Sequence, residues 1–145
     1  MSLATFDHPP FETLVDPVHG IVLGYAWGES VEGFLNDHPY AELVTDDADI
    51  QEYVVPIPFG FCGLESYSFF KYQLDCLVAI SIRWGLEGPV EIDAPCAQCI
   101  AMLANRWFTE EFREVDDGFF QLEQDTTRFS LDWMDQKLSL EEVLE

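Results

Sequence analysis

Two cysteines in the segment Cys96-Ala97-Gln98-Cys99 have the spacing of a redox motif, and Pro95 before them is typical of the first turn of a helix. The positive end of a helix dipole lowers the pKa of a thiol, which favours thiolate chemistry. Thioredoxin-like sites follow an early βαβ unit, however, whereas this motif follows an apparent antiparallel hairpin. We therefore interpret Cys96 and Cys99 as small apolar residues on the packing face of a helix.

Zinc is a second use for the same cysteines, together with Cys62 and Cys76. Structural zinc sites take their ligands from two close pairs, and only Cys96 and Cys99 form such a pair here. We predict no metal site and no cofactor. All four thiols are expected to be reduced, because a chain of 145 residues can bury a sufficient core without disulfides.

Other catalytic signatures are missing from the sequence. The histidines, His8, His19 and His38, lie beside proline or glycine, where turns explain them. The sequence contains no nucleophile motif, phosphate loop, dinucleotide fingerprint or EF-hand loop. We therefore predict no catalytic residue and expect that the chain is not an enzyme.

Acidic residues dominate the charge: 28 Asp and Glu stand against 6 Lys and Arg, which gives a formal net charge of -22. The first basic residue is Lys71, and two acidic clusters are the candidate partner-binding residues. The first cluster comprises Glu29, Glu32, Asp37, Glu42, Asp46, Asp47, Asp49 and Glu52. The second comprises Glu110, Glu111, Glu114, Asp116 and Asp117.

The mean charge density is well below that of DNA. A globule of 16.6 kDa exposes roughly 7,600 Å², or about 350 Å² per net charge. Duplex DNA has one charge per roughly 100 Å² of its surface. Mimicry of DNA therefore requires that the acidic residues gather on one face.

This charge excludes some partners and favours others. Nucleic acid and anionic membrane surfaces are repelled, so neither is an expected partner. The sequence has no long apolar run and no signal-peptide pattern at its start, which predicts a cytoplasmic protein. The expected partner is a basic nucleic-acid-binding protein, either a defence nuclease complex or a toxin. The oligomeric state is not predicted.

Our leading hypothesis is an acidic inhibitor that occupies the nucleic-acid groove of such a partner by DNA or RNA mimicry, as phage anti-CRISPR and anti-restriction proteins do. Three aromatic residues near the first cluster, Trp27, Phe34 and Tyr40, would anchor the interface if exposed. The alternatives are an immunity protein against a basic nuclease toxin, a protein adapted to high salt without a mimic role, and an unrecognised enzyme or small-molecule binder.

The elements that must position these residues form a single α+β domain over residues 1–145. Apolar residues alternate from Phe70 to Trp84, with a bulge or break expected near residues 73–75. Residues 85–88 read as a hairpin loop into a strand at 89–93, which gives a long central hairpin near 70–93. We expect an antiparallel sheet of about five to six strands and one main helix near 95–113.

Weaker signals complete the prediction. Further strands are expected at residues 20–27, 52–57, 118–123 and 128–133, the last two joined by a turn at 124–127. Ser30 is expected to cap a short acidic helix that reaches Asp37. Residues 139–142 have the spacing of a capping box and predict a frayed terminal helix.

Overall fold

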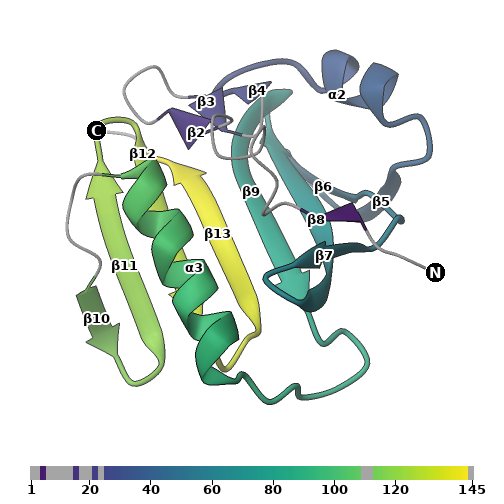
Figure 1. The fold of residues 1–145 in the computed structure, drawn as a ribbon. Coiled ribbons are helices and arrows are strands. Elements are labelled where there is room, and N and C mark those ends of the chain that lie inside the picture. The colour runs from purple at the N-terminus through teal and green to yellow at the C-terminus, as the bar shows by residue number, and fades with distance from the viewer. Residues whose placement is uncertain (1–3, 6–14, 17–20, 23–24, 109–112, 144–145) are drawn as a thin grey trace.

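The computed structural model describes residues 4–5, 15–16, 21–22, 25–108 and 113–143. The main element is one large sheet of ten strands, and two helices lie on it (Figure 1). The antiparallel, sheet-dominated α+β architecture is confirmed, but the expected five to six strands are too few. The strands of the large sheet are β1 (Ala4–Thr5), β5 (Glu42–Asp47), β6 (Ile50–Val54), β7 (Phe59–Phe61), β8 (Leu64–Gln73), β9 (Cys76–Trp84), β10 (Arg113–Asp116), β11 (Phe119–Gln124), β12 (Thr127–Asp132) and β13 (Lys137–Glu142).

Antiparallel neighbours follow one another across the sheet in the order β5, β6, β8, β9, β13, β12, β11, β10. The long strand β8 also pairs with β7 through its first residues, and β7 pairs with β1 in parallel. A separate small sheet contains β2 (Val15–Asp16), β3 (Ile21–Val22) and β4 (Tyr25–Ala26). Strands β5 and β10 therefore form the two edges of the main path through the described sheet.

The predicted long strand at residues 70–84 is in fact the hairpin β8–β9, which reverses direction at the break expected near residues 73–75. Its turn lies at Leu74 and Asp75, both with positive φ, and Leu74 is 69% exposed instead of buried. Cys76, also expected inside, is exposed. Across a two-residue turn, an even-numbered residue of β8 pairs with an odd-numbered residue of β9, as Tyr72 does with Leu77. A register shift beside Tyr72 changes this, so that beyond it even-numbered residues pair with even-numbered ones, as Phe70 does with Ile80. Apolar residues therefore keep the same parity on both strands, and the sequence resembles that of one continuous strand.

The other half of the expected central hairpin is wrong. Residues 85–93 form no strand and lead as a loop into helix α3. The expected strand at 20–27 instead contains β3 and β4, which pair with each other. Alternation over a few residues does not reveal where a chain reverses direction. The strand expected at 52–57 lies slightly earlier, as β6, and the predicted hairpin at 118–133 is confirmed as β11–β12.

The expected terminal helix at residues 139–142 is also wrong, because this segment belongs to β13. Leu138 and Leu140 are buried on one side of the strand, whereas Ser139 and Glu141 lie on the other. Strand β13 pairs with β9 on one side and with β12 on the other. Pairing along both edges outweighs a four-residue capping pattern.

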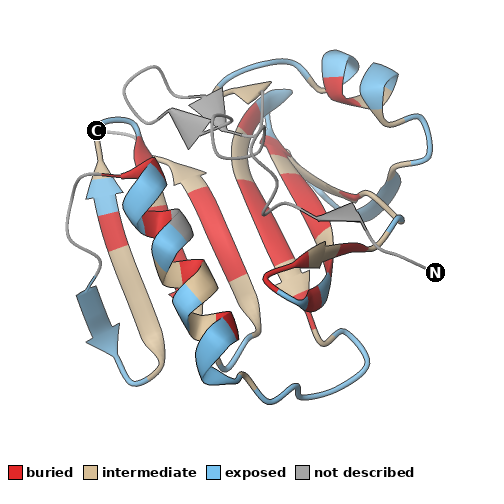
Figure 2. Cartoon of the chain, in the orientation of Figure 1, coloured by how far each residue is buried: buried red, intermediate tan, exposed pale blue. Residues whose placement is uncertain are grey.

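Helix α3 (Ala94–Trp107) begins as predicted and ends earlier than residue 113. Asp93 caps it by accepting a hydrogen bond from the Cys96 backbone N–H at 2.9 Å, and Phe108 is already extended. Its packing face, which includes Ile100 and Trp107, is buried against the central strands (Figure 2). The predicted short helix is confirmed as α2 (Val31–Asp37), with Ser30 at its N-cap.

Candidate functional site

Acidic side chains concentrate around the edge strand β5 and the hairpin ends beside it. Seven of the eight residues of the first cluster are exposed: Glu29, Glu32, Asp37, Glu42, Asp46, Asp47 and Asp49. None of these seven makes an ion pair with a described residue. Glu52 differs, because its carboxylate lies 2.9 Å from the guanidinium of Arg83 and is largely buried there.

Backbone hydrogen bonds bring three segments of this surface together. Leu74 N–H donates to Asp49 O, and Leu77 N–H donates to Glu29 O, both at 2.9 Å. These contacts place the β5–β6 turn, the β8–β9 turn and the start of α2 beside one another. We call the resulting surface the acidic end. It consists of Glu29, Glu32, Asp46, Asp47, Asp49 and Asp75.

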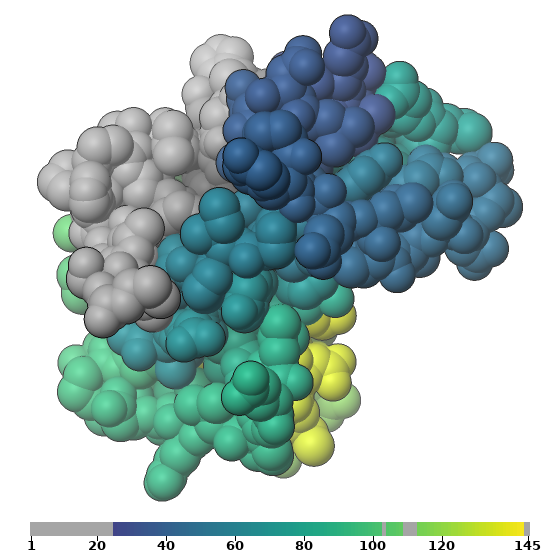
Figure 3. Space-filling view, turned by 90° about the vertical axis from the view of Figure 1, so that its right-hand side faces the viewer, coloured from purple at the N-terminus to yellow at the C-terminus, as the bar shows by residue number. Residues whose placement is uncertain are grey.

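Asp75 was missed by the sequence interpretation, which placed it within a strand. Its carboxylate accepts hydrogen bonds from Ser30 Oγ at 3.0 Å and from the Val31 N–H at 3.2 Å, at the start of α2. The positive end of a helix favours a carboxylate in this position. Asp75 therefore fixes α2 to the turn, and Figure 3 shows α2 and the β5–β6 hairpin on one face of the molecule.

An aromatic layer supports α2 from below. Phe34 is fully buried, and its ring centroid lies 4.3 Å from that of Phe70. Tyr25 packs edge-on against both rings and donates a hydrogen bond to Asp37 Oδ2 at 2.7 Å. Burial, followed by the bond to Asp37, raises the pKa of Tyr25. The acidic residues of α2 are thus held on a rigid support.

Tyr72 lies in the same layer and is 1% exposed. Its hydroxyl has no hydrogen-bond partner among the described residues. Burial raises the pKa of Tyr72, and the negative charges of Glu29 and Asp75 raise it further. This hydroxyl therefore lies within the negative field of the acidic end.

Basic residues lie elsewhere, mostly on the sheet face opposite the helices. On β8, β9, β12 and β13 these residues alternate with buried core residues, which directs their side chains to the open face. Arg83 pairs there with Glu52, and Arg128 lies 2.8 Å from Glu123 and 4.0 Å from Glu141. Of the six basic residues, five occupy this face: Lys71, Arg83, Arg113, Arg128 and Lys137. The scarce cations therefore compensate the open face and leave the acidic end uncompensated.

The second acidic cluster lies at the opposite edge of the sheet. Glu114, Asp116 and Asp117 are exposed at the β10–β11 turn, whereas Glu110 and Glu111 lie outside the described residues. Seven strand spacings of about 4.8 Å, or roughly 34 Å in total, separate β5 from β10 along the sheet. The fold does not bring the two clusters together.

The cysteines differ from the expectation of four reduced thiols. Cys62, in the β7–β8 turn, and Cys99, on α3, form a disulfide across 37 residues of sequence. Sequence spacing did not reveal this pair because the contact exists only in the folded chain. Cys96 remains a free, buried thiol, and burial followed by the charge of Asp93 raises its pKa. Because Cys99 is bonded to Cys62, Cys96 and Cys99 do not form the disulfide that their spacing would allow.

The three candidate aromatic anchors differ in how far their side chains are exposed. Phe34 belongs to the core, and Trp27 is half-buried with its indole N–H donating to Thr127 Oγ1 at 3.0 Å. Tyr40 is 75% exposed, next to the exposed Leu43 and Val44 of β5. Tyr40 is therefore the exposed aromatic residue of the three, but it precedes β5, whereas Asp46 and Asp47 lie at the far end of that strand.

Metal ligands and membrane-spanning helices are the remaining candidate features of the described part of the chain. In these residues, no three His, Cys, Asp or Glu side chains converge as a metal site. No described helix is long and apolar enough to cross a membrane. Comparison with protein-family models, with curated proteins and with solved structures found no match to this chain.

Proposed function

We propose that this chain is an acidic inhibitor that binds a basic nucleic-acid-binding protein through its acidic end. One observation carries the proposal: exposed carboxylates gather there without an ion pair to a described residue, while five of the six basic residues lie on the sheet face opposite the helices. Such a separation of charge favours a partner whose own surface is rich in Arg and Lys.

The arrangement suits charge mimicry at one edge of the molecule. Carboxylates opposite Arg and Lys replace phosphates, and the uncompensated field accelerates association. Because the second cluster lies roughly 34 Å away along the sheet, we assign binding to the β5 edge alone.

Protection of the sheet edge is a competing explanation for the same residues. Strands β5 and β10 are edges, and charged side chains on edges prevent pairing with other chains. Lysine serves that purpose as well as aspartate does. Reversal of charge therefore separates the two explanations, because it preserves edge protection and destroys mimicry.

The first experiment is a pull-down with the tagged protein from nuclease-treated lysate at low salt, with elution by a salt gradient. We expect one stoichiometric nucleic-acid-binding protein, released by moderate salt because its contacts are ionic. A defence nuclease would support the inhibitor, and a toxin encoded beside this chain would support the alternative of an immunity protein. Diffuse elution of many basic proteins would contradict both.

Charge reversal locates the surface. We predict that the triple variant Asp46→Lys, Asp47→Lys, Asp49→Lys weakens binding of the captured partner by roughly 100-fold, since attraction becomes repulsion worth about 3 kcal/mol in total. The matched control reverses the three described acidic residues of the other edge, Glu114, Asp116 and Asp117. Isothermal titration calorimetry measures both affinities. Equal losses in the two variants would remove the reason for choosing the β5 edge.

A further inference from the structure

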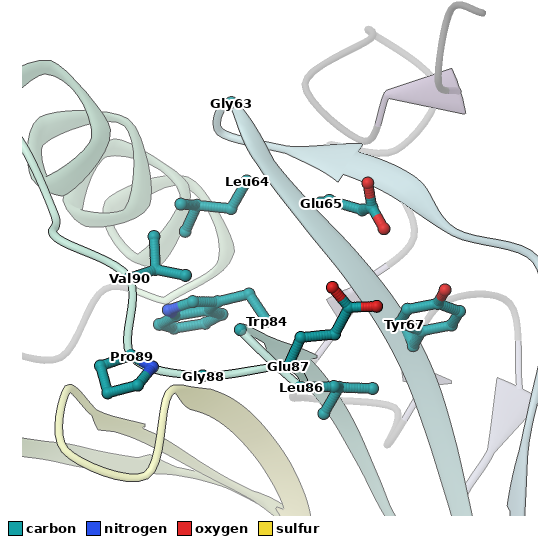
Figure 4. A pocket seen from close by; sticks show the side chains of 11 residues that line it. Gly63, Leu64, Glu65, Tyr67, Trp84, Leu86, Glu87, Gly88, Pro89 and Val90 are labelled. Atoms are coloured by element: carbon teal, nitrogen blue, oxygen red, sulfur yellow. The ribbon is translucent and has the colours of Figure 1, made fainter.

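A cavity of about 540 Å³ opens at the end of β8 that is remote from the acidic end. Its walls are the start of β8, the end of β9 and the loop at residues 85–90 (Figure 4). Cavities of roughly 300–1,000 Å³ are the usual size for small-molecule sites. The volume therefore suits a small organic ligand.

The loop wall is fixed by a single glutamine from the β12–β13 turn. The side chain of Gln136 donates to Gly85 O at 3.1 Å and to Gly88 O at 3.3 Å. Its Oε1 accepts a hydrogen bond from the Val90 N–H at 2.6 Å. The backbone of Trp84 is held as well, because its N–H donates to Gln136 O at 3.0 Å. The cavity is thus formed before any ligand binds.

Two sides of the cavity have different chemistry. Leu64, Trp84 and Val90 provide an apolar side. Figure 4 shows the carboxylates of Glu65 and Glu87 across from it, beside the phenol of Tyr67. None of the described residues in the lining is basic. An apolar body with a positively charged group complements both sides.

Trp84 adds an unsatisfied donor to the lining. The residue is 1% exposed, and its indole N–H has no acceptor among the described residues. Its nitrogen lies at the end of the ring near Val90 (Figure 4). A buried donor without a partner is costly, and because this nitrogen is closed off from solvent, a shift of the ring is needed before an acceptor on a ligand meets it.

We propose that this cavity is a binding site for a small organic cation: a primary ammonium on an apolar body that also carries a hydrogen-bond acceptor. The ammonium lies between Glu65 and Glu87, and the apolar body lies on Trp84. A divalent metal ion fits less well, because two carboxylates and a phenol are fewer oxygen ligands than Ca²⁺ requires.

This site is separate from the acidic end. It lies at Leu64 of β8, whereas the acidic end adjoins Gln73 at the other end of the same ten-residue strand. At about 3.3 Å per residue, the two sites are roughly 30 Å apart. The cavity therefore does not depend on the proposed inhibitor function.

Phenylalaninamide and 3-phenylpropionamide form a matched pair of probes, because they differ only in the ammonium group. Titration of the full chain near pH 6.5, followed by amide and indole NMR, should show phenylalaninamide binding with roughly millimolar affinity. The indole signal of Trp84, assigned as the one lost in Trp84→Phe, should shift. 3-Phenylpropionamide should bind at least about tenfold more weakly.

Variants complete the test. The pair Glu65→Gln, Glu87→Gln should weaken phenylalaninamide binding by about tenfold or more, with an unchanged thermal melt since both side chains are exposed. The control pair Glu91→Gln, Glu142→Gln changes the net charge equally outside the lining and should leave affinity unchanged. Equal binding of the two probes, equal losses in the two variant pairs, or no shift of the Trp84 signal would overturn the proposal.

Discussion

Tyr72 is an unusual residue in the core because its buried hydroxyl, near two carboxylates, has no hydrogen-bond partner among the described residues. A buried polar group without a hydrogen bond costs about 1–3 kcal/mol. Tyr25, in the same aromatic layer, has Asp37 as its acceptor. The two tyrosines therefore allow a direct comparison of a satisfied and an unsatisfied hydroxyl.

We predict that Tyr72→Phe raises the free energy of unfolding by about 1 kcal/mol, because it removes the unpartnered group. Tyr25→Phe is the control and should lower it by about 1 kcal/mol through loss of the bond to Asp37. Urea denaturation at pH 7 measures both values. A loss of stability in Tyr72→Phe equal to that in Tyr25→Phe would show that the Tyr72 hydroxyl is satisfied.

The same tyrosines determine the response to alkali. Burial raises the pKa of Tyr72 and of Tyr25, so the folded chain keeps protons that the unfolded chain releases near pH 10. The free energy of unfolding is therefore expected to fall as pH rises above about 10, and to fall less steeply in Tyr72→Phe. Parallel pH curves for the wild type and this variant would contradict the assignment.

At the scale of elements, the β8–β9 turn combines two residues of positive φ with a tertiary contact to α2. Leu74 and Asp75 have φ values of 50° and 63°, a region that favours Asn and Gly. Leu74 is exposed, whereas the carboxylate of Asp75 is bound to the start of α2. Substitutions at the two positions should therefore have opposite effects.

We predict that Leu74→Asn stabilises the chain by about 0.5 kcal/mol, because asparagine tolerates the left-handed region. Asp75→Gly should destabilise it by about 1 kcal/mol although glycine suits the turn, because two hydrogen bonds to α2 are lost. Thermal denaturation compares the two variants. Stabilisation by Asp75→Gly would show that the contact to α2 contributes little.

Elements with local signals could be predicted from the sequence. Asp93 and Pro95 mark the start of α3, Ser30 marks the start of α2, and the turn between β11 and β12 has polar turn residues. Elements that depend on distant pairing could not be predicted. Strand β13 lies between β9 and β12 because of contacts absent from its own sequence.

The candidate surfaces, like the elements, were predictable from the sequence only in part. Seven acidic residues of the first cluster are exposed, a property that their charge already indicates. The arrangement of those residues could be seen only in the structure. The β8–β9 turn adds Asp75 to the acidic surface, and the ion pair with Arg83 removes Glu52 from it. The cavity beside Trp84 had no sequence signal, since its lining joins residues 63–67, for which no element was predicted, to a loop that was predicted as a hairpin turn and strand.

At the scale of the whole molecule, a net charge of -22 destabilises the folded chain by self-repulsion. Between about 0.01 M and about 1 M salt, the screening length falls from about 30 Å to about 3 Å. We predict that the protein is folded at low salt and that its melting temperature rises with NaCl before levelling. Calorimetry across this range is the measurement. A chain that folds only in molar salt would instead support adaptation to a saline cytoplasm.

The position of β13 in the middle of the sheet also bears on how the protein is made. During translation, β5 to β9 leave the ribosome long before the strand that covers the free side of β9. Until residue 142 has been synthesised, the nascent chain presents the exposed strand edge of β9 beside apolar residues such as Ile80 and Ile82. Chaperone demand should therefore be greatest late in synthesis, and ribosome-bound chains stalled before β13 should aggregate more readily than those stalled after it.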